Sequence, residues 1–199
     1  MNLHEGIAAM NLALPEGAEQ KLADYLLLLA KWNRTYNLTA IRDPAQMVTH
    51  HVLDSLAVLP HLGDVETLAD VGSGAGLPGL TLAICRPGLK LTSVEANQKK
   101  AAFQQQAKIE LGLQNVSIHC GRVEGLAETF DAAISRAFAS LADFVRHAGH
   151  LAGRLLAMKG AYPAGEIADL PTGWKLCACH GLAVPGLAAE RHLLVLGRD

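Results

Sequence analysis

A glycine-rich segment is the part of this sequence whose residue types and spacing best fit ligand chemistry. It runs from Asp70 to Gly79 and reads Asp-Val-Gly-Ser-Gly-Ala-Gly-Leu-Pro-Gly. Glycine lets a backbone turn tightly and approach a ligand closely, because no Cβ stands in the way. The segment follows an apolar run typical of a strand and precedes a helix, the setting in which nucleotide-type ligands bind. We therefore expect Gly72, Gly74 and Gly76 to bind a cofactor.

The spacing of the glycines distinguishes between two classes of cofactor. A dinucleotide fingerprint is G-x-G-x-x-G, and Leu77 occupies the position of its third glycine. The pattern found here, G-x-G-x-G preceded by Asp70, resembles the first motif of Rossmann-like methyltransferases. Their cofactor, S-adenosylmethionine, has no pyrophosphate that a helix N-terminus would have to hold. The pattern therefore favours S-adenosylmethionine over NAD.

Glu95 is the acidic partner expected for this loop. It ends the next apolar run, about 20 residues past the loop, where an acid accepts hydrogen bonds from ribose hydroxyls. The order strand, loop, helix, strand and acid is more specific than the glycines alone. We expect Glu95 to bind the cofactor.

Arg136 follows a later predicted strand at its carboxyl end, the side on which ligands bind in a parallel sheet. A guanidinium group is always charged, and its planar fork suits a cofactor, an RNA phosphate or a guanine edge. The alternative is a surface ion pair with Glu124 or Asp131. Phe138 is expected either to stack on a base or to pack against apolar neighbours.

The elements that must position these residues alternate along the chain. A helix is expected from Asn97 to Leu111, ending at Gly112, and another over residues 141–151. Seven short apolar runs predict strands: Thr67–Val71, Leu89–Val94, Val116–His119, Asp131–Ile134, Arg154–Met158, Trp174–Cys179 and His192–Leu196. Alternating strands and helices imply a parallel sheet, and the last two strands favour an antiparallel hairpin at its edge. The predicted fold class is α/β, a Rossmann-like, mostly parallel seven-stranded sheet with helices on both faces.

An N-terminal helical extension is expected before the sheet. Ala18–Trp32 has leucines at helical spacing, and Asp43-Pro44 begins a second helix that runs to about Leu59. We expect a single methyltransferase domain, with a helical part over residues 1–63 and a Rossmann-like core over residues 64–199.

Trp32 and Tyr36, four residues apart, are expected to form a packed pair that closes the N-terminal helix onto the sheet. Asp54 and Ser55 are predicted to cap or brace that contact.

Composition restricts the class of protein further. Half of the 199 residues are hydrophobic and 18% are charged, which excludes a disordered or fibrous chain. The formal net charge is −2, so binding of nucleic acid would need a local basic patch. Its candidates, each individually better explained as a solvated charge, are Lys31, Arg34, Arg42, Lys99, Lys100, Arg146 and Lys159.

Other site types find no support in the sequence. His50 and His51 lack further ligands at matching spacing, so no metal site is expected. The four cysteines are expected to be reduced structural thiols. No leader and no apolar run long enough for a bilayer is visible, so we expect no membrane partner and a cytoplasmic location. We also expect a monomer.

Several further segments resemble one known family over nearly the whole chain, from about Leu22 to Leu196. Two blocks are the most specific: Lys31-Trp32-Asn33 with Tyr36-Asn37-Leu38-Thr39, and Ser135-Arg136-Ala137-Phe138-Ala139. His51-Val52-Leu53-Asp54-Ser55-Leu56, Arg122-Val123-Glu124 and Lys159-Gly160 also match. Together with the glycine loop they resemble the bacterial RsmG family, the small-subunit ribosomal RNA methyltransferases once called glucose-inhibited division protein B.

The resemblance implies an activity and a set of contacts. It implies S-adenosylmethionine-dependent methylation of N7 of one guanosine in 16S rRNA, with the 30S subunit as the expected partner. It places cofactor contacts on Gly72, Leu77, Val123, Glu124 and Arg136, and we expect Arg136 also to be catalytic. Guanine N7 carries a lone pair and no proton, so catalysis needs positioning and electrostatics rather than a general base.

Three alternatives remain open at the level of the sequence. One is a methyltransferase of the same fold that acts on another RNA site or on a small molecule. A second is a non-catalytic nucleotide-binding or ribosome-assembly module. A third, an NAD-dependent oxidoreductase, is disfavoured by the missing third glycine of the dinucleotide fingerprint.

Overall fold

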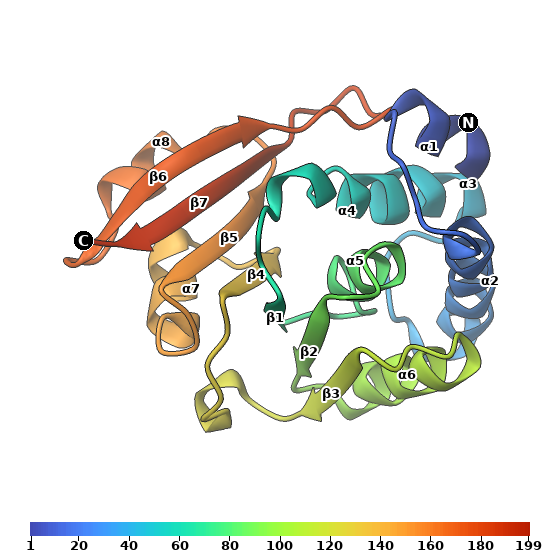
Figure 1. Cartoon of the computed structure of the whole chain (residues 1–199), viewed down its shortest axis with the longest axis horizontal. Coiled ribbons are helices and arrows are strands. Elements are labelled where there is room, and N and C mark those ends of the chain that lie inside the picture. Colours follow the sequence, from blue (N-terminus) through green and yellow to red (C-terminus); the bar gives the residue numbers. More distant parts are fainter.

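The computed structural model describes all residues, Met1–Asp199, and is built around one seven-stranded sheet (Figure 1). The strand order is β3-β2-β1-β4-β5-β7-β6. The strands are β1 (Thr67–Val71), β2 (Lys90–Glu95), β3 (Val116–Cys120), β4 (Ala132–Arg136), β5 (Arg154–Lys159), β6 (Trp174–Gly181) and β7 (His192–Arg198). All neighbours up to β5 are parallel, and β7 pairs antiparallel with both β5 and β6. The predicted mostly parallel sheet with a closing hairpin is confirmed.

The order of the strands creates a single switch point between β1 and β4. From β1 the chain proceeds outward through β2 and β3, then crosses to β4 and β5 on the other side of β1. Since all five are parallel, their carboxyl ends lie at one edge of the sheet. Ligands bind outside these ends, at the switch point.

Helices cover both faces of the sheet, as predicted. The larger apolar core lies under α2 (Ala18–Tyr36), α5 (Gly79–Cys85) and α6 (Gln98–Glu110). The smaller core lies on the other face, under α7 (Leu141–Ala148), with the short α8 (Ala164–Ala168) beside it. Figure 1 shows these two groups of helices on either side of the central strands.

The N-terminal part differs from the prediction in its second helix. The helix expected from Asp43 to Leu59 is divided into α3 (Pro44–Met47), a π-helical turn η1 (Val48–Leu53), α4 (Asp54–Leu56) and a 3₁₀ turn η2 (Leu59–His61). The predicted start is correct, because the Asp43 side chain accepts the Ala45 N–H at 3.0 Å and Pro44 occupies the first turn. A further helix, α1 (Leu3–Ala9), was not predicted, and a capping box of Asn2 and Glu5 begins it.

The aromatic pair at the end of α2 forms, but it packs on a helix rather than on the sheet. The ring centroids of Trp32 and Tyr36 are 5.2 Å apart, and Trp32 meets Phe103 of α6 at 5.7 Å. Asp54 and Ser55 do not brace this contact. Ser55 Oγ donates to the His51 carbonyl at 2.6 Å, and the Asp54 carboxylate binds two arginines.

All four cysteines are free thiols, and only Cys85 is buried. None of the helices combines the length and the apolar character that crossing a membrane requires.

Candidate active site

The glycine loop leaves β1 at the switch point and turns back over the sheet. The Gly72 N–H donates to the Val94 carbonyl of β2 at 2.9 Å, and the Gly76 N–H donates to Ser73 O at 2.8 Å. Gly72, Gly74 and Gly76 have φ values of +68°, +60° and +83°, a region that favours glycine. A Cβ on Gly72 or Gly74 would meet no atom within 4 Å, whereas one on Gly76 would lie 2.4 Å from Leu80 Cδ1. The first two glycines thus leave the space above the loop open for a ligand.

Glu95 ties the loop to the end of β2. One carboxylate oxygen accepts the Gly74 N–H at 2.7 Å, and the other accepts the Asn97 N–H at 2.8 Å. Each carboxylate oxygen has a further lone pair, so the group can still accept a hydroxyl of a ligand. Glu95 therefore shapes the loop in addition to the cofactor contact predicted for it.

Residues that no motif indicated support the loop from below. Ser93 Oγ donates to Gln104 Oε1 at 2.5 Å, and Gln104 Nε2 donates to Ser73 Oγ and Gly74 O, both at 2.8 Å. The buried Tyr25 hydroxyl of α2 donates to Ala75 O at 2.8 Å. Burial raises the pKa of the Tyr25 phenol, so this hydroxyl stays a donor. The N-terminal extension therefore contributes directly to holding the glycine loop.

Asp70, the last acid before the loop, is fully buried. Its Oδ2 accepts the Gly79 N–H at 2.7 Å, while its Oδ1 has no hydrogen-bond partner. A Cβ on Gly79 would lie 2.6 Å from Asp70 Oδ2, so this approach requires glycine. Burial raises the pKa of Asp70 to about 7, against the opposing effect of the Gly79 N–H.

The raised pKa of Asp70 predicts a pH dependence of stability. The folded chain keeps the proton up to about pH 7, whereas the unfolded chain releases it near the ordinary value of 3.8. The contribution of Asp70 to the free energy of unfolding is therefore full below that ordinary pKa and falls as the pH rises towards 7, by on the order of 4 kcal/mol. Urea unfolding at pH 5 and pH 7.5 should show a smaller loss of stability for Asp70→Asn than for wild type. Equal losses in the two proteins would contradict the assignment.

A cavity of about 320 Å³ lies over the carboxyl ends of β1, β2 and β3. Its lining includes Gly72, Glu95, Val123, Glu124 and Phe138. It therefore brings together four of the eight residues predicted to bind the cofactor, namely Gly72, Glu95, Val123 and Glu124. Val123 and Glu124 begin a 3₁₀ turn, η3 (Val123–Gly125), and a Glu124 carboxylate oxygen lies 2.5 Å from His147 Nδ1.

The other four, Gly74, Gly76, Leu77 and Arg136, do not line this cavity. The Leu77 side chain is buried. Phe138, whose role the sequence left open, packs its ring 5.2 Å from that of Phe144 while one side faces the cavity.

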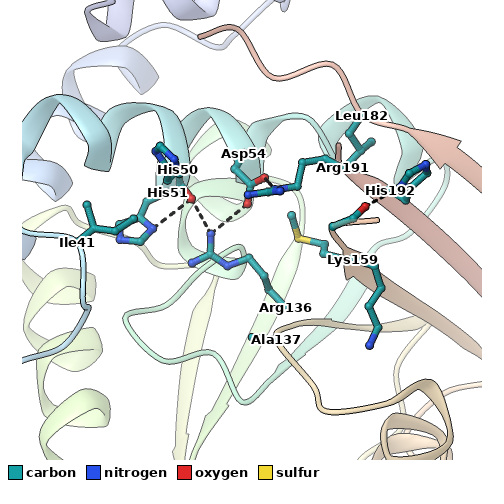
Figure 2. A pocket seen from close by; sticks show the side chains of 12 residues that line it. Ile41, His50, His51, Asp54, Arg136, Ala137, Lys159, Leu182, Arg191 and His192 are labelled. Atoms are coloured by element: carbon teal, nitrogen blue, oxygen red, sulfur yellow. Dashed lines mark hydrogen bonds and ion pairs between the residues drawn. The ribbon is translucent and has the colours of Figure 1, made fainter. Parts of the chain in front are cut away.

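A second cavity, of about 440 Å³, contains Arg136 (Figure 2). Arg136 Nη1 donates to the His50 carbonyl at 3.0 Å and to Asp54 Oδ2 at 3.2 Å. Arg191, which directly precedes β7, donates through Nε to Asp54 Oδ1 at 2.9 Å. We call this space the arginine cavity. Lys159 and His192 also line it.

The alternative prediction, that Arg136 pairs with Glu124 or Asp131, is wrong. Glu124 is paired with His147 in the first cavity. Asp131 lies at the opposite end of β4, where its carboxylate accepts the N–H groups of Glu66 and Thr67 at 2.9 and 2.8 Å. The ion pair of Arg136 is instead with Asp54 of the N-terminal part, which the sequence did not indicate.

The two cavities adjoin at the end of β4. Arg136 lines one and Phe138 lines the other. Between them, Ala137 has φ +76°, an uncommon conformation for a residue with a Cβ. Non-glycine residues in this region cluster at ligand sites, where surrounding contacts hold them.

His51 lies behind Arg136 as a neutral side chain. Its Nδ1–H donates to the His50 carbonyl at 3.2 Å, which leaves Nε2 to accept the Thr39 hydroxyl at 2.9 Å. Burial, and secondarily the positive charge of Arg136, lower the pKa of His51 to about 4. Neither ring nitrogen is free to take a proton from a substrate at neutral pH.

Of the seven residues predicted as candidates for a basic patch, only Lys159 lines one of the two cavities. Lys159 pairs with Glu166 at 2.8 Å at the arginine cavity, and Arg146 pairs with Asp143. Arg42 donates to the Asn37 side chain at 2.7 Å. Lys31 and Arg34 line a separate apolar groove along α2, away from both cavities.

The sheet order, the glycine loop and the acid at the end of β2 define a class of protein, the Rossmann-like S-adenosylmethionine-dependent methyltransferases. Solved structures agree with this fold. A methyltransferase described as SAM dependent, from Aquifex aeolicus, matches with a TM-score of 0.57 and 16% identity over 77% of this chain and 93% of that one. TrmN from Thermus thermophilus matches with a TM-score of 0.59 and 19% identity over 76% of this chain and 53% of that one.

The particular family follows from the sequence comparisons. Residues 18–194 match the GidB family model, rRNA small subunit methyltransferase G, and the chain belongs to that family. The ribosomal RNA small subunit methyltransferase G of Aromatoleum aromaticum is 56% identical over 99% of this chain and 98% of its own length. The ribosomal RNA small subunit methyltransferase G of Neisseria meningitidis is 52% identical over 98% of this chain and 97% of its own length. The chain is an S-adenosylmethionine-dependent methyltransferase, and the resemblance seen in the sequence is confirmed.

Glu95→Gln is expected to weaken binding of S-adenosylmethionine by roughly 1–3 kcal/mol, because a charged acceptor of ribose hydroxyls and of the Gly74 N–H is lost. Isothermal titration calorimetry measures the effect. Glu128→Gln, a change of the same kind at an exposed position outside this cavity, is the control. An affinity for Glu95→Gln equal to that of the control would mean that Glu95 does not contact the cofactor.

Proposed function

We propose that the protein transfers a methyl group from S-adenosylmethionine to N7 of a specific guanosine in 16S rRNA, within the 30S subunit. The cofactor contacts proposed are Gly72, Gly74, Gly76, Leu77, Glu95, Val123 and Glu124, whereas Arg136, which lines the arginine cavity, is proposed to act on the substrate. The cytoplasm, where ribosomal subunits are assembled, is the proposed location, and a monomer the proposed active form. The names of the two relatives support rRNA of the small subunit as the substrate.

One observation supports the choice of N7: the two buried titratable groups beside Arg136, His51 and Asp54, are not free to act as a general base. His51 is neutral with both ring nitrogens engaged, and both carboxylate oxygens of Asp54 are bound to arginines. Methylation of an exocyclic amine or of a protonated ring nitrogen requires removal of a proton. Guanine N7 has an in-plane lone pair and no proton, so it needs no base and suits a site where Arg136 and Arg191 supply positive charge.

In this proposal one cavity binds the cofactor and the arginine cavity binds the guanine. When bound, S-adenosylmethionine would supply an electrophilic methyl group to N7, with its sulfonium sulfur as the leaving group. The glycine loop and Glu95 would hold it at the ends of β1 and β2. Arg136, with donors directed at the adjoining cavity, holds the guanine in line and offers hydrogen bonds to O6 or to a phosphate.

Incubation of the protein with labelled cofactor and 30S subunits tests this proposal. We expect label in one nucleotide, which mass spectrometry of the digested rRNA should identify as N7-methylguanosine. A parallel reaction with naked 16S rRNA asks whether the assembled particle is needed. Label at another atom or another RNA would point to a different substrate of the same fold. Cofactor binding without label in any RNA would favour a small-molecule substrate or a non-catalytic role.

A further inference from the structure

We propose that Asp54 is the positioning residue for methyl transfer: its single buried carboxylate holds the guanidinium groups of Arg136 and Arg191 in place at the cavity that takes the target nucleotide. The inference rests on the proposed function, because it assumes that this cavity receives the guanosine. Asp54 itself touches neither the base nor the cofactor in this proposal.

The first support is the difference in burial between the acid and its partners. The side chain of Asp54 is only 4% exposed, whereas those of Arg136 and Arg191 are 24% and 25% exposed. All three side chains line the cavity, and the carboxylate is more deeply buried than the two arginines that bind it (Figure 2). A carboxylate this deeply buried is costly unless cations satisfy it, and here a separate guanidinium binds each oxygen.

The second support is the π-helical turn that ends at Asp54. In an α-helix the Asp54 N–H would bond to the carbonyl four residues back, that of His50. Here it bonds to Thr49 O and His51 O instead, and the His50 carbonyl accepts Arg136 Nη1 and His51 Nδ1. π-Helical turns are rare and occur frequently at functional sites. The turn thus presents two acceptors, the His50 carbonyl and the Asp54 carboxylate, to one nitrogen of Arg136.

This anchoring leaves donors for a ligand. Both hydrogen bonds of Arg136 are made by Nη1, so its Nε and Nη2 hydrogens are not used by the protein. One carboxylate faces two guanidinium groups, so positive charge remains in excess at the cavity. Fixed donors with excess positive charge suit guanine O6 or a backbone phosphate. Without Asp54 the two arginines would repel each other and lose this orientation.

Asp54→Asn tests the proposal because it keeps the shape of the side chain and removes its charge. We expect single-turnover methylation at saturating 30S subunits to slow by about 10- to 100-fold. We expect the Kd for S-adenosylmethionine, measured by calorimetry, to stay within about twofold of wild type, since Asp54 does not line the cofactor cavity. Asp64→Asn, which breaks the exposed pair with Arg154, is the matched control and should react at the wild-type rate.

The outcomes separate positioning from a merely structural role. A wild-type rate for Asp54→Asn overturns the proposal, as does a parallel fall in rate, cofactor affinity and melting temperature. If Asp54→Asn does not fold, Asp54→Glu replaces it. This change keeps the charge but displaces both guanidinium groups, so a rate loss of at least about fivefold with normal cofactor affinity is expected, and an unchanged rate overturns the proposal. If wild type itself forms no N7-methylguanosine, the proposed function fails, whatever the variants do.

Discussion

Arg136→Lys is expected to slow methyl transfer roughly 10²–10³-fold while the fold and the melting temperature are retained. Lysine keeps the positive charge but has a single nitrogen, so it cannot reach Asp54 and the His50 carbonyl and still offer a planar fork to the guanine. Because N7 needs no base, this orientation accounts for most of what the protein contributes at the substrate. Arg136→Ala should lose at least as much.

Single-turnover methylation of 30S subunits, with the melting temperature measured alongside, provides the test. Arg154→Lys is the matched control, since Arg154 begins β5 at the opposite edge of the sheet and pairs with Asp64. The control should methylate at the wild-type rate. Full activity of Arg136→Lys would remove Arg136 from the mechanism. A melting temperature far below that of the control would reduce its role to the ion pair with Asp54.

Gly72→Val is expected to reduce the affinity for S-adenosylmethionine at least about 100-fold. Gly72 lines the cofactor cavity, and a side chain there would project into space that no protein atom occupies. The φ of +68° adds backbone strain of about 1–2 kcal/mol, which lowers stability without filling the core. The loss of binding is therefore expected to exceed what the strain alone would cause.

Gly112→Val is the control that separates obstruction of the cofactor cavity from backbone strain. Gly112 follows α6 with φ +63°, and a Cβ added there would also meet no atom within 4 Å, but this glycine lies outside both cavities. It carries the same strain, so both variants should melt lower by similar amounts while only Gly72→Val loses the cofactor in calorimetry. Similar cofactor affinities in the two variants would disprove the placement of the cofactor over the loop.

The sequence by itself determined the parts of this protein that depend on neighbours in the chain. The strands were predicted because an apolar run between turn residues has few other ways to bury itself. The loop was predicted from its glycines, because glycine readily adopts the positive φ values that the structure has at Gly72, Gly74 and Gly76. Glu95 followed from its position at a strand end, and parallel pairing of β1 with β2 then brought it to the loop.

Only the tertiary structure decided the partners of Arg136 and the supports of the loop. Asp54 is 82 residues from Arg136 and 137 from Arg191, and Tyr25 is 50 residues from Ala75. No local preference distinguishes Asp54 from the acids first considered, Glu124 and Asp131, because an ion pair forms wherever the packed elements bring opposite charges together. The π-helical turn was equally invisible, since its side chains are compatible with an α-helix and its geometry is stabilised by contacts with β4. The arrangement of the arginine cavity therefore depends on how the segment from His50 to Asp54 packs against the end of β4, and not on sequence spacing.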